Sequence, residues 1–149
     1  MTRSMNRREA LAAGAGAVAA GVGLTAGPAQ ALNDYAEQIK KFTGGKTPVE
    51  GSVRLDLPEL AENGNTVPLS VAVEAPAAGV HVEEVLVVAP ANPTARVIRF
   101  RFSPSSVPEA STRIRLAETQ TVVAVAKLSD GTFLQAARQI KVTIGGCGG

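Results

Sequence analysis

Hydrophobic residues recur at every second position through most of the chain after Gly51. In residues 53–57 and 69–73, for example, apolar side chains alternate with polar or small ones. Because successive side chains of a strand point to opposite faces, this period indicates strands with one buried face. Alternating or continuously apolar runs of this kind predict about seven strands, at residues 53–57, 69–73, 82–89, 98–102, 112–116, 122–128 and 140–144.

Proline and glycine separate these runs at short intervals, as turns between strands require. Asp130-Gly131 stands between two apolar runs, which is a strong signal for a tight hairpin. Residues 82–89 are almost continuously apolar and predict a central strand. The pattern therefore predicts an all-β domain over residues 46–144, an immunoglobulin-like antiparallel β-sandwich. A small closed barrel is the alternative.

A short helix is expected before the β-domain, at residues 32–45. Asp34 and Glu37 have the spacing of a capping box, and Gly44-Gly45 would end the helix. Tyr35, Ile39 and Phe42 form an apolar stripe at helical spacing. This stripe packs either on the β-domain or on a partner protein, and the sequence does not separate the two.

Residues 1–31 have the order of an export signal. The twin arginine Arg7-Arg8 precedes an apolar Ala/Gly-rich stretch, and Ala29-Gln30-Ala31 provides small residues for a signal peptidase. The stretch is short and weakly hydrophobic compared with the roughly 20 apolar residues of a membrane-spanning helix. We therefore expect cleavage after Ala31, export to the periplasm by the twin-arginine route, and no stable membrane anchor.

Composition excludes several classes of function. Residues 1–31 contain three arginines and one acidic residue, so the rest of the chain has equal numbers of basic and acidic residues. With 3% aromatic residues and no net positive charge after residue 31, nucleic-acid binding is not expected. One histidine and one cysteine do not provide a zinc ligand set. No catalytic motif is found, so we expect no catalytic residue, no metal and no cofactor.

The chain ends in a glycine-rich segment around its single cysteine, Cys147. We expect this segment to be a flexible arm formed by Gly145, Gly146, Gly148 and Gly149 around that thiol. Fully extended, residues 145–149 would reach roughly 17 Å from the last strand. Because such an arm would not be packed, valine at Gly146 or Gly148 should leave the melting temperature nearly unchanged. The sequence near Cys147 offers no basic residue, so a partner enzyme would have to activate the thiol.

The bland interpretation of Cys147 is an incidental residue in a frayed terminus. An exposed thiol in the periplasm is, however, prone to oxidation and cross-linking. Other polar residues have structural interpretations: His81 as a solvated or packed residue, Asn63-Gly64 as a turn, and Glu83 and Glu84 on opposite faces of a strand, where they cannot form an acid–base pair. One polar sheet face is expected to be solvated or to dock an acidic partner, and it would carry Arg99, Arg101, Arg113 and Arg115.

The twin-arginine signal, short helix, β-domain and terminal Gly-Gly-Cys-Gly-Gly together resemble the SoxY family, the sulfur carriers of bacterial thiosulfate oxidation. Residues 60–68 also resemble that family. The resemblance implies that sulfur is attached covalently to Cys147, as a cysteine S-thiosulfonate. It also implies a heterodimer with a SoxZ-like β-sandwich subunit. The implied enzymes are a haem-containing one that conjugates thiosulfate, a hydrolase that releases sulfate, and in some systems a sulfane dehydrogenase.

The sequence thus predicts a periplasmic sulfur carrier that partner enzymes act upon and that is not itself an enzyme. The alternative is a structural or binding β-sandwich protein that an intermolecular disulfide tethers to its partner. A thiol oxidoreductase is a third hypothesis, but the chain has no second cysteine to resolve a mixed disulfide.

Overall fold

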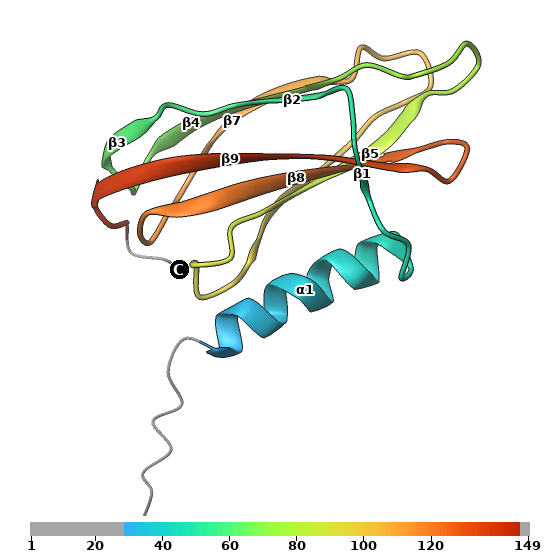
Figure 1. Ribbon diagram of the computed structural model, residues 1–149. Helices are drawn as coiled ribbons and strands as arrows, with labels where there is room; N and C mark the ends of the chain where they lie inside the picture. Colours follow the sequence, from blue (N-terminus) through green and yellow to red (C-terminus); the bar gives the residue numbers. More distant parts are fainter. Residues whose placement is uncertain (1–28, 147–149) are drawn as a thin grey trace, which may run out of the picture.

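The computed structural model describes the backbone of residues 29–146 and the side chains of residues 34–146. In this part of the chain one helix precedes nine strands. Two sheets face each other, and the helix lies against the outer side of the larger sheet (Figure 1). The elements are α1 (Ala29–Thr43), β1 (Val49–Glu50), β2 (Val53–Asp56), β3 (Leu60–Asn63), β4 (Val67–Val73), β5 (Val82–Val88), β6 (Arg96–Arg101), β7 (Glu109–Ile114), β8 (Gln120–Leu128) and β9 (Phe133–Ile144).

The larger sheet has the strand order β1-β9-β8-β5-β6, and β3 also pairs with β9. The smaller sheet has the order β2-β4-β7. Neighbouring strands are antiparallel except at β1–β9 and β3–β9, which are parallel. This arrangement confirms the predicted all-β sandwich, and it differs from the alternative of a closed barrel because the strands form two separate sheets.

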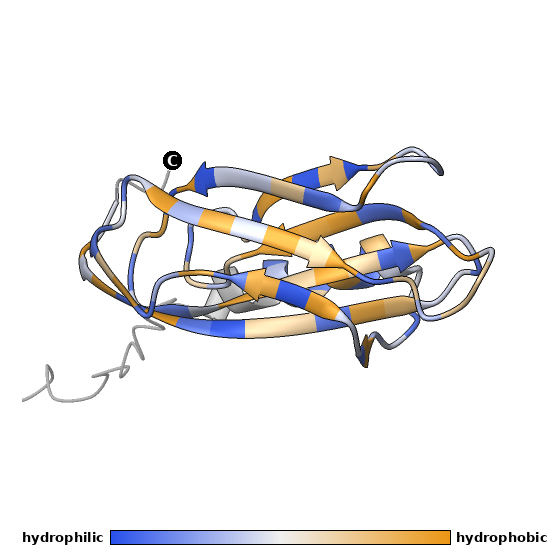
Figure 2. Ribbon diagram, turned by 90° about the horizontal axis from the view of Figure 1, so that it is seen from above, coloured by the Kyte–Doolittle hydropathy of each residue, from blue (hydrophilic) through white to orange (hydrophobic). Residues whose placement is uncertain are grey.

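The main hydrophobic core lies between the two sheets. On β4 the alternate residues Val67, Leu69, Val71 and Val73 are buried, while the residues between them face outward. The same alternation of apolar and polar side chains is visible as bands along the strands in Figure 2. The period of two in the sequence therefore reports one buried face of each outer strand.

The central strands β5 and β8 are buried on both faces because each lies between the second sheet and the helix. One face joins the core between the sheets, while Leu86, Val88, Val123 and Val125 form a second cluster with Phe133 on the other face. This confirms residues 82–89 as a central strand and explains why apolar side chains follow one another there without alternation.

The second cluster is completed by the predicted helical stripe of Tyr35, Ile39 and Phe42. The rings of Phe42 and Phe133 meet edge to face with centroids 5.8 Å apart. The Arg99 guanidinium lies 5.1 Å from the Phe42 ring centroid, within the range of a cation–π contact. The stripe thus packs on its own β-domain, which decides the question that the sequence left open.

Only the C-terminal end of the helix agrees with the prediction. At the C-terminal end the Gly45 amide donates to the Lys40 carbonyl at 3.1 Å, as expected for the Gly44-Gly45 stop. At the other end α1 begins at Ala29 and not at residue 32. Asp34 therefore lies inside the helix, where its carboxylate accepts a hydrogen bond from Gln38, and the predicted capping box with Glu37 is wrong.

Other differences concern strands. The predicted strands 53–57, 69–73, 98–102, 112–116 and 122–128 correspond to β2, β4, β6, β7 and β8 within a few residues. The segment 140–144 is only the end of the twelve-residue β9, and β1 and β3 were not expected. The hairpin at Asp130-Gly131 is confirmed, since the Leu128 amide donates to the Thr132 carbonyl at 2.9 Å.

Candidate functional site at the end of the last strand

Strand β9 ends in a junction of three backbone segments that come from distant parts of the sequence. The Gly64 amide, just after β3, donates to the carbonyl of Ile144 at 2.8 Å. The Leu116 amide, just after β7, donates to the Gly64 carbonyl at 2.8 Å, and the Gly146 amide donates to the Leu116 carbonyl at 2.9 Å. The backbone that leads to Cys147 is therefore hydrogen-bonded to the body of the domain as far as Gly146.

Close backbone approach at this junction leaves no space for side chains on its glycines. A Cβ atom on Gly145 would overlap the carbonyl oxygen of Ala117. A Cβ atom on Gly146 would lie 2.7 Å from the carbonyl oxygen of Gly64 and 2.9 Å from the amide nitrogen of Asn65. Glycine is thus required at these two positions for packing, and not only for freedom of the backbone.

The structure therefore differs from the expected arm at its first two residues. Gly145 and Gly146 were predicted to move freely, but both are held against the domain by the contacts above. A free arm can begin only after Gly146, which shortens its reach from the anchored backbone. The remaining predicted arm residues, Cys147, Gly148 and Gly149, lie outside the described residues, as do Arg7 and Arg8 of the predicted signal.

Two buried amide side chains hold the loop on which the junction rests. Asn92 donates to the Arg115 carbonyl at 2.8 Å, and its side-chain oxygen accepts from the Ala117 amide at 2.9 Å. Gln120 donates to the same Asn92 oxygen at 3.1 Å and accepts from the Ala91 amide at 2.9 Å. Because buried amides are costly to leave unpaired, this network fixes the backbone on either side of Leu116.

Sequence reasoning missed both Asn92 and Gln120. Asn92 stands between two prolines, a composition that is typical of an ordinary loop. Gln120 precedes an apolar run and looks like the polar start of a strand. Only their partners, which are 23 to 29 residues apart from them along the chain, show that the two side chains support the C-terminal junction.

The four arginines that were expected on one polar face lie on two different sheets. Arg99 and Arg101 belong to β6, where both pair with Glu84, at 3.8 and 2.9 Å respectively. Arg113 belongs to β7 of the smaller sheet, and Arg115 follows that strand. The expectation of a single face is therefore wrong, because β6 and β7 are edge strands of opposite sheets.

Glu83 and Glu84 form ion pairs with basic side chains on two different strands, β8 and β6 respectively. Glu83 contacts Lys127 at 2.8 Å, and this hydrogen bond holds the pKa of the Glu83 carboxyl below its ordinary value. Glu84 instead contacts Arg99 and Arg101. The two carboxylates are thus engaged separately, in agreement with the expectation that they do not form an acid–base pair.

The remaining predicted positions have backbone roles. His81 exchanges hydrogen bonds with Ser129: the His81 amide donates to the Ser129 hydroxyl, and the Ser129 amide donates to the His81 carbonyl. This agrees with a structural role for the residue. A turn is found at the expected place: Asn63 ends β3, its side-chain oxygen accepts a hydrogen bond from the Asn65 amide at 2.9 Å, and Gly64 lies in the turn. Gly64 is in addition a member of the junction that anchors β9.

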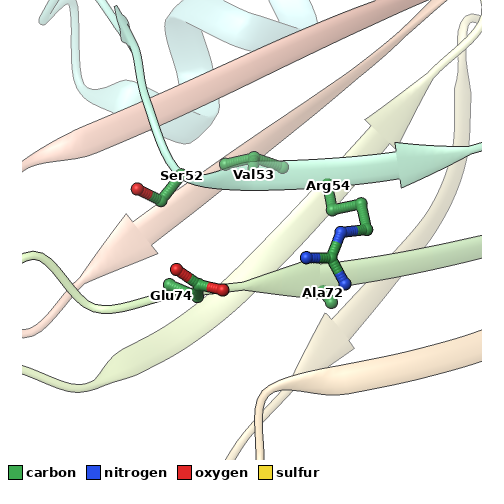
Figure 3. A pocket seen from close by; sticks show the side chains of 5 residues that line it. All are labelled: Ser52, Val53, Arg54, Ala72 and Glu74. Atoms are coloured by element: carbon green, nitrogen blue, oxygen red, sulfur yellow. The ribbon is translucent and has the colours of Figure 1, made fainter.

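A shallow hollow of about 230 Å³ lies on the smaller sheet near the start of β2. Ser52, Arg54 and Glu74 contribute its polar side chains, and Figure 3 shows them with Val53 and Ala72. The lining contains no histidine, no cysteine and no second carboxylate, so the acid–base pairs of hydrolytic sites are not present there.

Among residues 34–146 no three His, Asp or Glu side chains lie close enough together to hold a metal ion. No helix in the described part of the chain is long and apolar enough to cross a membrane.

Comparison with solved structures places the fold beside known proteins. The sulfur carrier protein SoxY from Chlorobium limicola f thiosulfatophilum is 32% identical, over 75% of this chain and 98% of that one, with a TM-score of 0.63. The superoxide reductase (neelaredoxin) from Ignicoccus hospitalis is 15% identical, over 62% of this chain and 80% of that one, with a TM-score of 0.54. A putative superoxide reductase from Thermotoga maritima is 16% identical, over 68% and 89%, with a TM-score of 0.52. At these identities the two reductases show a shared fold alone.

No curated protein sequence matches the chain. Residues 39–147 match the family described as "Sulfur oxidation protein SoxY". The match includes part of α1, every strand and the junction, and it extends to Cys147. The chain therefore belongs to the SoxY family, and it is a sulfur carrier rather than an enzyme.

Proposed function

We propose that this chain carries thiosulfate-derived sulfur on the thiol of Cys147 and presents it to the enzymes of a Sox system. The observation that carries the proposal is membership of the SoxY family over residues 39–147. Cys147 is the single cysteine of the chain, so any covalent attachment through a thiol has one candidate atom. In the sequence it directly follows Gly146, the last described residue that is hydrogen-bonded to the body of the domain.

The proposed loading step forms one sulfur–sulfur bond. The Cys147 thiol loses its proton, and its Sγ bonds to the outer sulfur of thiosulfate, which gives a cysteine S-thiosulfonate. Two electrons leave the pair of sulfur atoms, and the haem-containing conjugating enzyme accepts them. The carrier contributes only the thiol, since activation of a thiolate requires a positive or polar environment, and that environment is supplied by the enzyme.

The release step is a hydrolysis. Water attacks the terminal sulfonate sulfur, the bond between the two thiosulfate sulfurs breaks, and sulfate leaves. A persulfide then stays on Cys147, and a sulfane dehydrogenase is the class of enzyme that would oxidise it further. Throughout these steps the carrier is paired with a SoxZ-like subunit as a heterodimer.

The proposed location is the periplasm, reached by the twin-arginine route. Support comes from the order of Arg7-Arg8, the apolar stretch and Ala29-Gln30-Ala31 in the sequence. Replacement of both arginines by lysine should leave the precursor uncleaved in the cytoplasm, and fractionation with N-terminal sequencing would measure this. Export of the lysine variant at the wild-type level would contradict the proposed route.

The experiment that tests the carrier role is intact-mass spectrometry of the protein isolated from cells that oxidise thiosulfate. A population should carry an added thiosulfonate or persulfide that reductant removes. The Cys147→Ser protein, which keeps every described contact of the junction, should carry none. Unmodified wild-type protein under the same conditions would contradict the proposal.

A further inference from the structure

A groove of about 330 Å³ separates the edges of the two sheets, between β6 and β7. Three arginines line it: Arg96 at the start of β6, Arg113 on β7, and Arg115 just after β7. All three side chains are exposed, while the partly buried Ile98 and the buried Ile114 provide apolar surface between them. We call this surface the arginine groove.

The arginine groove carries positive charge that the rest of the described chain does not neutralise. No acidic residue lines it. The ion pairs found within residues 34–146 involve none of its arginines, although Arg99 and Arg101 on the same strand β6 both pair with Glu84. Arg113 has one polar contact, at 3.4 Å to the Thr66 hydroxyl. Three guanidinium groups therefore face solvent around one concave surface.

The groove and the C-terminal junction are attached to the same piece of backbone. Asn92, which lines the groove, donates to the Arg115 carbonyl and accepts from the Ala117 amide. Between these two residues lies Leu116, whose carbonyl accepts the hydrogen bond from Gly146. The position of Arg115 is thus fixed relative to the residue that precedes Cys147.

Because Cys147 directly follows the anchored Gly146, a partner that reaches its thiol also comes close to the domain. One Cα–Cα step of about 3.8 Å separates Cys147 from the anchored Gly146. A protein that receives the Cys147 sulfur must therefore approach the body of the carrier closely while the Gly146 bond is intact. Arg115 of the groove directly precedes Leu116, whose carbonyl holds Gly146, so a protein that approaches Gly146 comes within reach of this arginine.

We propose that the arginine groove is a docking surface for an acidic patch on the enzymes that receive Cys147. This inference rests on the proposed carrier function. Guanidinium groups suit carboxylates because their planar fork forms paired hydrogen bonds. Unneutralised charge on the carrier accelerates encounter and orients the partner without requiring tight binding. A carrier that serves several enzymes in turn needs this combination of fast association and easy release.

The test uses the mature carrier with its paired subunit and, as probe, the thiosulfate-conjugating enzyme of the same Sox system. Arg96→Glu, Arg113→Glu and Arg115→Glu are made singly and together. Adduct formation is measured against carrier concentration at ionic strengths of about 0.02 M and about 0.5 M, where charges are weakly and strongly screened respectively. We expect the triple variant to raise the KM for the carrier about tenfold at low salt with kcat nearly unchanged, and to lose most of that difference at high salt.

Arg138→Glu is the matched control for each single variant, because Arg138 is exposed on β9, has no ion pair among the described residues, and undergoes the same replacement of one arginine by glutamate. Each single variant should raise KM more than this control. If the triple variant changes KM no more than this control, the docking proposal is wrong. Three other results would also overturn it. The first is a KM difference that does not respond to salt. The second is protection of the groove from hydrogen exchange by the paired subunit alone. The third is saturable binding of inorganic thiosulfate there at constant ionic strength. Loading of the wild type on Cys147 is scored separately, so the carrier function can stand when the docking surface fails.

Discussion

The amide of Gly146 donates a 2.9 Å hydrogen bond to the carbonyl of Leu116, and this bond fixes the chain one residue before its single cysteine. Around the bond, Gly64 and Ala117 approach so closely that neither Gly145 nor Gly146 has space for a Cβ atom. The glycine segment at the C-terminus therefore combines two roles. Its first two residues are packed structure, and only the residues after Gly146 can serve as an arm.

Valine at Gly146 should destabilise the domain. Its Cβ atom would lie 2.7 Å from the Gly64 carbonyl oxygen, and the neighbour is backbone that cannot move aside without breaking the junction. We expect a loss of about 1–3 kcal/mol in the free energy of unfolding, the usual cost of overpacking, measured by urea denaturation. The control Gly148→Val should unfold like wild type. Equal stability of Gly146→Val and wild type would mean that Gly146 is not packed as described.

Removal of the Asn92 side chain should loosen the loop around Leu116, to which Gly146 is hydrogen-bonded. Asn92→Ala leaves the Arg115 carbonyl and the Ala117 amide without their side-chain partner, and it removes one of the two acceptors of the Gln120 side-chain amide. We expect a loss of about 2–3 kcal/mol in unfolding free energy, because buried polar groups would lose their hydrogen bonds.

Hydrogen exchange separates this effect from general instability. The Gly146 amide should exchange faster in Asn92→Ala than in wild type under native conditions, since its acceptor is on Leu116. The control Gln139→Ala changes an exposed side-chain amide on β9. It should alter neither the free energy of unfolding nor the exchange rate of the Gly146 amide. Unchanged protection of Gly146 in Asn92→Ala would show that the loop is held by other contacts.

Much of the fold could be predicted from sequence because its signals are local. The alternation in β4 and the continuous apolar run of β5 each follow from which faces are buried, and burial selects side chains residue by residue. The Asp130-Gly131 turn and the stripe of α1 are likewise set by a few neighbouring residues. A pattern of this kind is readable without knowledge of the strand order.

The missed elements depend on partners far along the chain. In β3 only Ala61 is buried, so Leu60–Asn63 has no alternating pattern, and the strand exists because it pairs in parallel with the end of β9. The first half of β9 contains Gln135, Ala136 and Ala137, which have weak strand propensity, and β8 holds that segment in register. The packing of Gly145 and Gly146 has the same origin, since its partners lie in two other loops.

Truncation of Phe42 tests how much the packing of α1 on the larger sheet contributes to the stability of the domain. The ring packs edge to face on Phe133 and lies beneath the Arg99 guanidinium. Because Phe42 is only partly buried, Phe42→Ala should cost about 2–3 kcal/mol, somewhat less than a fully buried phenylalanine. Thermal unfolding would measure the change, with Lys40→Ala on the exposed side of the helix as control. A variant as stable as this control would indicate that the helix contributes little to the domain.

The Asp130 turn predicts a specific dependence of stability on pH. The Thr132 amide donates to the Asp130 carboxylate at 2.9 Å, and this hydrogen bond holds the pKa of Asp130 below its ordinary value of 3.8. A carboxyl whose pKa is lower in the folded state stabilises the protein above that pKa, and the benefit is lost as the pH falls. Wild type should therefore exceed Asp130→Asn in stability near neutral pH, and the difference should shrink as the pH falls below about 4, the ordinary pKa of an aspartate. A difference that stays constant over this range, measured by denaturation at each pH, would contradict the assigned hydrogen bond.

The most direct test of the account is the mass of the Cys147-containing peptide after purified carrier is incubated with thiosulfate and the conjugating enzyme. We predict that one thiosulfonate is added to Cys147, that reductant removes it, and that Gly146→Val is loaded more slowly than Gly148→Val because the backbone before the thiol is displaced. Modification at any other residue, or no modification of Cys147 while the enzyme is active, would contradict the claim that this sulfur atom is the carrier.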